Sequence, residues 1–224
     1  MTTSAGLPYA SILLLLSVSL NPSWSSALAC PCAEFKSPQR TVDVRKGLVY
    51  MSTAGYRQEA GSALSSARRA CERHLGEAHV AVVSDIDETL LDNSQVARQS
   101  PDDFWKGFRA YEATASAPLL KGTAAFLSWA RKHGFAVFLV TGRNESERLA
   151  TIENLLRDGV AYDGLFMRAV GDKRSAAVYK PAVREEIEKM GFKIVVNIGD
   201  QPTDLLGGHA EDCELLPNLM YSVP

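Results

Sequence analysis

The chain has 224 residues, of which 46% are hydrophobic and 22% are charged, and its formal net charge is −2. This length suits one well-buried domain and excludes two large ones. Because a nucleic-acid backbone is bound by clustered Lys and Arg, and the sequence has no strong basic run, a nucleic-acid polymer is not favoured as a partner.

Residues 1–29 have the pattern of an export signal peptide, which leaves 30–224 as the folded domain. Ile12 to Leu20 is an apolar run too short to span a bilayer, and Ala27-Leu28-Ala29 fits a small-x-small cleavage site. No Lys or Arg precedes this run, so a buried strand or a membrane anchor remains the alternative. We expect a secreted or periplasmic protein. Cleavage at this site would place Cys30 first, which leaves a lipoprotein anchored at Cys30 open.

The cysteines leave several arrangements open. In an oxidising compartment an even number permits two disulfides, with three possible connectivities. The residues are Cys30, Cys32, Cys71 and Cys213. Cys30-Pro31-Cys32 also resembles a metal or redox pair, but no second close Cys/His pair completes a zinc site. Cys71 lies on an apolar helical stripe, and we interpret it as a buried small side chain.

The rest of the chain alternates between helix and strand patterns. In chain order the predicted elements are a helix over Gly55–Leu75, a strand over His79–Ser84, a helical insertion over 92–118, a helix over Lys121–His133, a strand over Phe135–Val140, a helix over Asn144–Asp158, a strand over Tyr162–Arg168, a helix to Met190 with Pro181 in its first turn, and a strand over Lys193–Ile198. This alternation predicts an α/β fold with a mostly parallel sheet flanked by helices.

Polar residues follow three of the predicted strands. Asp85 and Asp87 follow the first, Thr141 the second and Asp200 the last. Since sites in parallel sheets form beyond the carboxyl ends of the strands, we expect these side chains to lie close together.

These residue types suit hydrolysis of a phosphate monoester, which needs a nucleophile, a proton source for the leaving alkoxide and positive charge for the phosphoryl oxygens. Asp85 is the candidate nucleophile, and Asp87 is the candidate general acid and then base. Thr141 offers a hydroxyl, and Gly142 an open backbone N–H, to the phosphoryl group. Asp200 completes a Mg²⁺ site with Asp85, because magnesium prefers oxygen ligands. A lysine is still needed to neutralise the phosphoryl-enzyme.

The order and spacing of the motifs resemble the haloacid dehalogenase (HAD) phosphatases. Asp85-Ile86-Asp87-Glu88-Thr89 matches their DxDxT opening, Val140-Thr141-Gly142-Arg143 resembles their second motif, and Gly199-Asp200-Gln201-Pro202-Thr203-Asp204 resembles the GDxxxD fourth motif. Val178-Tyr179-Lys180 and the tail Leu216-Pro217-Asn218-Leu219-Met220-Tyr221 look like HAD subfamily IIIB. That subfamily includes bacterial class C acid phosphatases and plant vegetative storage proteins, and the resemblance covers most of the chain.

The resemblance implies a HAD-type Rossmann-like parallel sheet with a small helical cap, formed by residues 38–78 and 94–119 or thereabouts. It implies a secreted, Mg²⁺-dependent acid phosphatase acting on small phosphate monoesters, with nucleotides as one candidate class. It also implies that Asp85 and Asp87 act as nucleophile and acid/base. Mg²⁺ would be held by the Asp85 carboxylate, the Asp87 main-chain carbonyl and Asp200, with Asp204 in support.

For the phosphoryl group, the resemblance implies binding by Thr141, with Arg143 helping to bind the substrate. Lys173 and Lys180 are both candidates for the third-motif lysine, and the Tyr-Lys context favours Lys180. Where the subfamily often has Trp-Ser in the fourth motif, this chain has Pro202-Thr203, which leaves the shape of that loop open.

Other functions remain as alternatives. A calcium loop at Asp85 is disfavoured because an EF-hand requires Gly where Leu90 stands. A dehalogenase is disfavoured by Asp87, since dehalogenation needs no acid for the leaving group. The main alternative is a non-catalytic storage or binding protein of the same fold, because some storage-protein relatives have lost the nucleophile, which is present here. Trp105 and its aromatic neighbours belong to the core of the insertion or to the wall of the substrate pocket.

Overall fold

Five parallel strands form the central sheet, in the order β3-β2-β1-β4-β5. They are β1 (Val80–Ser84), β2 (Ala136–Asn144), β3 (Gly164–Arg168), β4 (Lys193–Gly199) and β5 (Asp212–Leu215). This computed structural model describes residue 32 and residues 42–223, so the predicted signal peptide and Cys30 lie outside the described part. The predicted parallel α/β sheet is confirmed.

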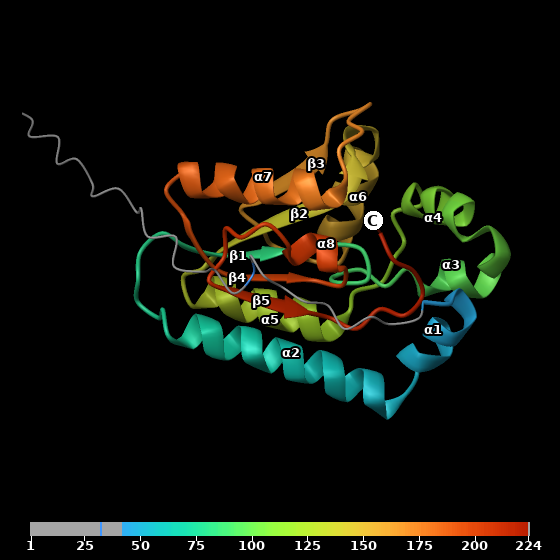
Figure 1. Cartoon of the computed structure of the whole chain (residues 1–224), viewed down its shortest axis with the longest axis horizontal. Coiled ribbons are helices and arrows are strands. Elements are labelled where there is room, and N and C mark those ends of the chain that lie inside the picture. The colour runs from blue at the N-terminus through green and yellow to red at the C-terminus, as the bar shows by residue number, and fades with distance from the viewer. Residues whose placement is uncertain (1–31, 33–41, 224) are drawn as a thin grey trace, which may run out of the picture.

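Helices flank the sheet and cover the carboxyl ends of its strands. They are α1 (Val44–Met51), α2 (Ala54–Glu72), α3 (Ser94–Gln99), α4 (Phe104–Glu112), α5 (Lys121–Lys132), α6 (Arg148–Arg157), α7 (Ala176–Lys189) and α8 (Pro202–Leu205), with short 3-10 turns η1 (Pro101–Asp103) and η2 (Glu145–Glu147). α7 lies on one face of the sheet and α2 with α5 on the other, while α1, α3 and α4 gather beyond one end of the strands (Figure 1). None of the helices between residues 42 and 223 is long and apolar enough to cross a membrane.

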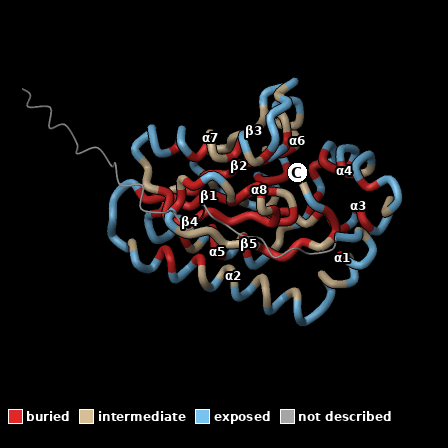
Figure 2. Tube along the Cα trace, viewed as in Figure 1, coloured by how far each residue is buried: buried red, intermediate tan, exposed pale blue. Residues whose placement is uncertain are grey.

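β1 lies at the centre of the core, and all of its residues are buried. Val82 packs on the face that carries Leu127 of α5, whereas Val83 packs on the face that carries Tyr179 and Ile187 of α7. Because both faces of the strand are covered, its sequence is a continuous apolar run rather than an alternating one. Buried residues are concentrated along the strands, and the outer sides of α2 and α7 are exposed (Figure 2).

α1 packs against the C-terminal tail and fixes it beside the ends of the strands. The carboxylate of Asp43 caps α1 by accepting from the Lys46 N–H (2.8 Å). The Asp43 N–H donates to the Leu219 carbonyl (2.9 Å). A Cβ on Gly47 would lie 2.4 Å from the Met220 nitrogen, so only glycine lets the tail cross α1 this closely.

The prediction that Pro181 lies in the first turn of its helix is wrong. α7 begins at Ala176, and Pro181 lies inside it. Proline removes one backbone hydrogen bond there. Burial of Tyr179, Val183 and Ile187 against the sheet stabilises the helix and offsets that loss.

The largest boundary differences from the predictions are at β2 and α6, and one strand was not predicted. β2 continues through Asn144 instead of ending at Val140, and the following helix α6 begins at Arg148. The Asn144 side chain accepts from the Ser146 N–H (3.0 Å), so Asn144 starts the turn η2 rather than the helix. The edge strand β5 was not predicted, and its four residues are only partly buried.

A disulfide joins Cys32 to Cys213 of the edge strand β5. It ties Cys32 to the sheet across a sequence separation of 181 residues. Cys71 is free and buried, which confirms its interpretation as a core side chain.

Replacing Cys213 by Ser is expected to lower the free energy of unfolding by about 2–5 kcal/mol, because the unfolded chain regains the freedom that the crosslink removes. Denaturant unfolding with and without a thiol reductant measures this loss. Cys71→Ala is the control, since it keeps the disulfide and should remain sensitive to reductant. Equal sensitivity in Cys213→Ser would contradict the pairing.

Candidate active site

Asp85 directly follows β1 and lies at the centre of the site. Its backbone N–H donates to the Ile198 carbonyl of β4 (2.9 Å), which fixes the main chain between the two central strands. Its Oδ1 accepts a hydrogen bond from Lys180 Nζ (2.5 Å), and Lys180 also donates to Asp204 Oδ1 (2.6 Å). Of the two candidate lysines, Lys180 therefore contacts Asp85. Lys173 is exposed on the rim of a cavity that opens above Asp85.

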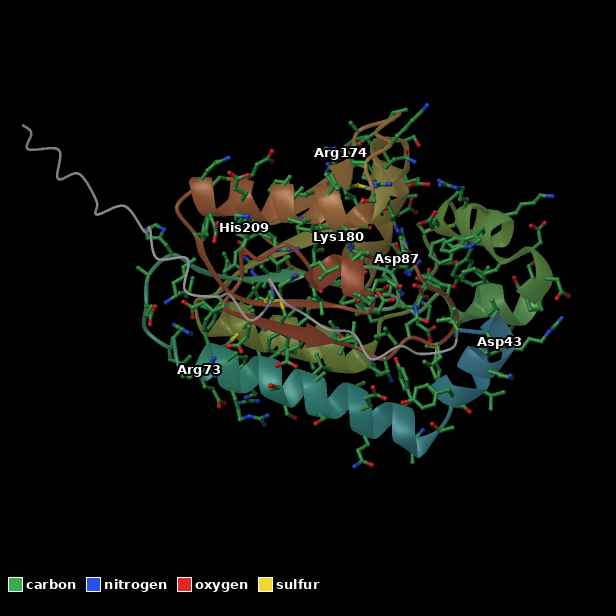
Figure 3. The ribbon with its side chains drawn as sticks, viewed as in Figure 1. Asp43, Arg73, Asp87, Arg174, Lys180 and His209 are labelled. Atoms are coloured by element: carbon green, nitrogen blue, oxygen red, sulfur yellow. A yellow bond between two sulfur atoms is a disulfide. The ribbon has the colours of Figure 1, made fainter. Side chains whose placement is uncertain are left out.

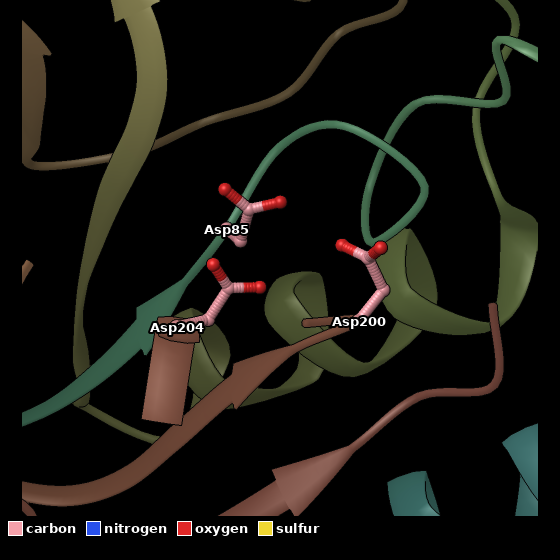
Figure 4. A group of neighbouring side chains, drawn as sticks. All are labelled: Asp85, Asp200 and Asp204. Atoms are coloured by element: carbon pink, nitrogen blue, oxygen red, sulfur yellow. The ribbon is translucent and has the colours of Figure 1, made fainter. Parts of the chain in front are cut away.

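Asp85, Asp200 and Asp204 converge from the ends of β1 and β4 and from α8 (Figure 4). One carboxylate oxygen of each lies within 4.8 Å of the others, and all three residues are buried. A Cβ on Gly199 would lie 2.4 Å from the Cβ of Asp204, so glycine is required for Asp204 to reach the group. The fully buried Arg184 holds this loop by donating to the Asp204 carbonyl (2.7 Å).

The electrostatics of this carboxylate cluster favour a cation. Burial raises the pKa of Asp85, and repulsion from Asp204 and Asp200 adds to it against the attraction of Lys180. Burial, followed by repulsion from Asp204, raises the pKa of Asp200 to about 7. Burial alone would lower the pKa of Lys180, but Asp204 and Asp85 attract its charge and raise it. Three carboxyl groups thus face one ammonium, and a divalent cation with oxygen ligands fits the excess negative charge.

The loop after β1 turns back sharply at Glu88, whose φ of 54° is unusual for a residue with a Cβ. The Glu88 carboxylate holds this turn by accepting from the Asn93 N–H (2.9 Å) and from the Tyr221 hydroxyl. Burial raises the pKa of Glu88 well above its usual range. The turn brings Asp87 to the cavity that Lys180 also lines, and both residues are labelled in Figure 3.

Asp87 is bound to Arg143, the last residue of the second motif. Arg143 Nη2 lies 2.5 Å from Asp87 Oδ1, and Nε lies 3.0 Å from Oδ2. Asn93 Nδ2 also donates to Oδ1 (3.0 Å). A second carboxylate, Glu112 of α4, lies 3.3 Å from Arg143 Nε. Burial, then the charge of Asp87, raises the pKa of Glu112 to about 8.

The two remaining residues of the second motif differ in exposure. Gly142 is exposed and lines the cavity, and nothing lies within 4 Å of the position of a Cβ there. Thr141 is fully buried, and its Oγ1 accepts from the Arg143 N–H (3.1 Å). The structure therefore places Thr141 just below the cavity that the other predicted site residues line.

The cavity above these residues has a volume of about 490 Å³. Asp85, Asp87, Lys180, Asp200 and Asp204 line its base. Its wall carries three aromatic side chains from the insertion and the C-terminal tail, namely Trp105, Phe108 and Tyr221, with the Trp105 and Tyr221 rings 5.0 Å apart. Its rim carries Arg109, Arg168, Lys173 and Arg174.

Three residues outside the predicted site fix Asp200. Thr89 Oγ1 donates to its Oδ1 (3.1 Å). Asn218 Nδ2 (2.7 Å) and Gln201 Nε2 (2.5 Å) donate to its Oδ2. Thr89 and Asn218 lie in motifs that carry the family resemblance, so the sequence held a signal for both residues. No local pattern in the sequence indicated a role for Glu112.

Comparisons with known proteins find plant relatives of this chain. The chain is 35% identical over 150 residues to acid phosphatase 1 of Solanum lycopersicum, an alignment that covers 63% of this chain and 58% of that protein. It is 30% identical over 151 residues to vegetative storage protein 1 of Arabidopsis thaliana, covering 63% and 55%. The chain thus spans little more than half the length of these two relatives.

Among solved structures, the class C acid phosphatase from Bacillus anthracis superimposes with a TM-score of 0.66 at 22% identity, covering 80% of this chain and 85% of that one. This likeness shows that the two proteins share a fold. The model of one family matches residues 25–224, which is most of the chain. The chain therefore belongs to HAD superfamily subfamily IIIB, the acid phosphatase family.

Proposed function

We propose that this protein is an exported, Mg²⁺-dependent phosphomonoesterase that forms an aspartyl-phosphate on Asp85. The observation that carries the proposal is the buried Asp85 carboxylate, held at Oδ1 by Lys180 on the floor of an open cavity. Membership of an acid phosphatase family supports the reaction class.

In the first half-reaction, a carboxylate oxygen of Asp85 attacks phosphorus and the bond to the ester oxygen breaks. Asp87, which lines the same cavity, supplies the proton to the leaving alkoxide. In the second half-reaction Asp87 takes a proton from water, which attacks phosphorus and releases phosphate and the Asp85 carboxylate. The ammonium group of Lys180, bonded to Asp85 Oδ1, offsets the negative charge around Asp85 in both half-reactions.

A bound Mg²⁺ would be held by the carboxylates of Asp85 and Asp200 and the main-chain carbonyl of Asp87, with Asp204 in support. It would supply positive charge to the phosphoryl oxygens. Thr89, Asn218 and Gln201 keep the Asp200 carboxylate in one orientation, as ligands of a metal are usually kept.

The aromatic wall of the cavity favours esters with a flat leaving group. Trp105 is 53% exposed although it packs 5.0 Å from the Tyr221 ring, so one side of the wall remains open to a ligand. Aromatic faces stack well with aryl and nucleobase rings. We therefore propose aryl phosphates and nucleotides as the preferred class of phosphate monoester.

Export is proposed from the signal pattern over residues 1–29. The disulfide between Cys32 and Cys213 supports it, because such bonds persist in oxidising compartments. A lipid anchor at Cys30 is the alternative, which the intact mass of the mature protein distinguishes from an unmodified N-terminus.

Removing the metal is expected to abolish hydrolysis. We expect the purified protein to hydrolyse p-nitrophenyl phosphate and a nucleoside monophosphate, to lose this activity in EDTA and to regain it on addition of Mg²⁺ in excess.

The similarity to a vegetative storage protein motivates the second candidate, a non-catalytic storage protein. A folded, Mg²⁺-loaded protein without turnover at acidic and neutral pH would favour that candidate.

A further inference from the structure

The proposed reaction does not account for a chain of charged groups that is bonded to Asp87. The side chain of Arg143 is only 1% exposed, and each nitrogen of its guanidinium contacts a protein group. Nε and Nη2 contact Asp87, Nε also contacts Glu112, and Nη1 donates to Thr151 Oγ1 (3.2 Å). Arg143 lines the cavity, but protein groups already occupy all three nitrogens of its guanidinium.

The chain links three parts of the fold. Asp87 stands in the loop after β1, Arg143 in β2, and Glu112 is the last residue of α4 in the insertion. Glu112 is 6% exposed and ends the helix that carries the aromatic wall. Arg143 therefore links α4 of the insertion to Asp87, which Asn93 also contacts directly.

We propose that Arg143 and Glu112 are positioning residues, which hold the Asp87 carboxyl group toward the leaving-group oxygen. This inference rests on the proposed function, in which Asp87 transfers the proton. Such a transfer requires a carboxyl group within hydrogen-bond reach of the ester oxygen. The three hydrogen bonds from Arg143 and the one from Asn93 restrict the rotation of the Asp87 side chain. Glu112 fixes the arginine in turn.

Leaving-group dependence distinguishes positioning from substrate binding. A nitrophenolate departs without a proton, whereas the alkoxide of glycerol phosphate needs one. The value of kcat/KM reports only steps up to phosphoryl transfer, so later proton abstraction from water does not affect it. We therefore compare kcat/KM for p-nitrophenyl phosphate and glycerol phosphate in the Mg²⁺-loaded protein.

For Arg143→Ala we expect kcat/KM for glycerol phosphate to fall by about 100-fold, which lies within the range that general acid catalysis contributes. The kcat/KM for p-nitrophenyl phosphate should change little, because its leaving group needs no proton. Glu112→Ala should lower the glycerol phosphate value by about tenfold, and Glu112→Gln, which keeps an acceptor oxygen, should restore most of it. The double variant should be no worse than Arg143→Ala, since Glu112 acts through Arg143. Arg45→Ala and Asp102→Ala are the matched controls, because this exposed pair (2.7 Å) also joins an arginine to the insertion but lies outside the cavity.

An equal fall of kcat/KM for both substrates in Arg143→Ala, with raised KM, would overturn the proposal and assign Arg143 to substrate binding. Additive losses in the double variant would overturn the role of Glu112. Thermal melting of each variant identifies loss of folding, and in that case Arg143→Lys and Glu112→Gln carry the same comparison. A wild-type protein that hydrolyses neither substrate refutes the proposed function itself, whereas an active wild type with equal losses refutes this inference alone.

Discussion

Asp85→Asn is expected to lower kcat for phosphate ester hydrolysis by at least about 10⁴-fold, the scale of loss seen when an enzyme loses its nucleophile. Asparagine has nearly the same shape, and its carbonyl oxygen can still accept the hydrogen bond from Lys180 Nζ. The substitution removes the charge and the nucleophilic oxygen but keeps the packing around this buried position. Steady-state hydrolysis of p-nitrophenyl phosphate in excess Mg²⁺ measures the effect.

Asp103→Asn is a suitable control, because Asp103 is an exposed carboxylate that lies outside the cavity. Its turnover should match the wild type. If Asp85→Asn kept most of its activity while remaining folded, another group would have to attack phosphorus, and the proposed intermediate would be wrong.

Lys180→Met is expected to lower the free energy of unfolding of the metal-free protein by about 3–5 kcal/mol, because it leaves buried carboxylates without their cation. Lys180 is 4% exposed and bonds to both Asp85 and Asp204. For a domain of this size, that loss corresponds to a fall in melting temperature of roughly 10 °C. Turnover should also be lost, and Mg²⁺ should recover part of the stability because it neutralises the same carboxylates.

Lys173→Met is the matched control, since Lys173 is an exposed lysine on the rim of the same cavity. Surface substitutions of this kind change stability by about 0.5 kcal/mol or less. Thermal melting of both variants, with and without Mg²⁺, gives the comparison. A large loss in Lys173→Met with none in Lys180→Met would reverse the assignment of the lysine.

The parts of the site that sequence predicts well are those that follow from strand order. Asp85 and Asp200 come directly after a strand and Asp87 follows two residues after Asp85, and parallel strands bring their carboxyl ends to one edge. Spacing therefore predicts that these residues meet. Lys180 was found through its tyrosine neighbour, although its helix starts earlier than Pro181 suggests.

The parts that sequence predicts poorly depend on contacts between distant segments. β5 has a polar sequence and forms because it pairs with β4 and is joined to Cys32 by the disulfide. The C-terminal tail reaches the site because Gly47 lets it cross α1, so Asn218 can bond to Asp200. No local sequence pattern indicates such contacts between distant segments.

Arg143 belongs to a recognised motif, yet its contacts with distant segments were not predicted from the sequence either. The family resemblance implies that Arg143 helps to bind substrate, but the motif does not predict which protein groups contact its guanidinium. In the structure, Glu112 from the insertion and Asp87 from the loop after β1 occupy its guanidinium. A pairing over such sequence distances depends on how the insertion folds back, which the sequence pattern leaves open.

Trapping the intermediate tests the central claim most directly. The Mg²⁺-loaded protein is mixed with p-nitrophenyl phosphate, quenched in acid within the first turnover, digested and analysed by mass spectrometry. The account predicts one added phosphoryl group on the peptide that contains Asp85, labile to hydroxylamine and missing from Asp85→Asn. Phosphate on a different residue, or rapid turnover with no phosphorylated peptide at any time point, would contradict it.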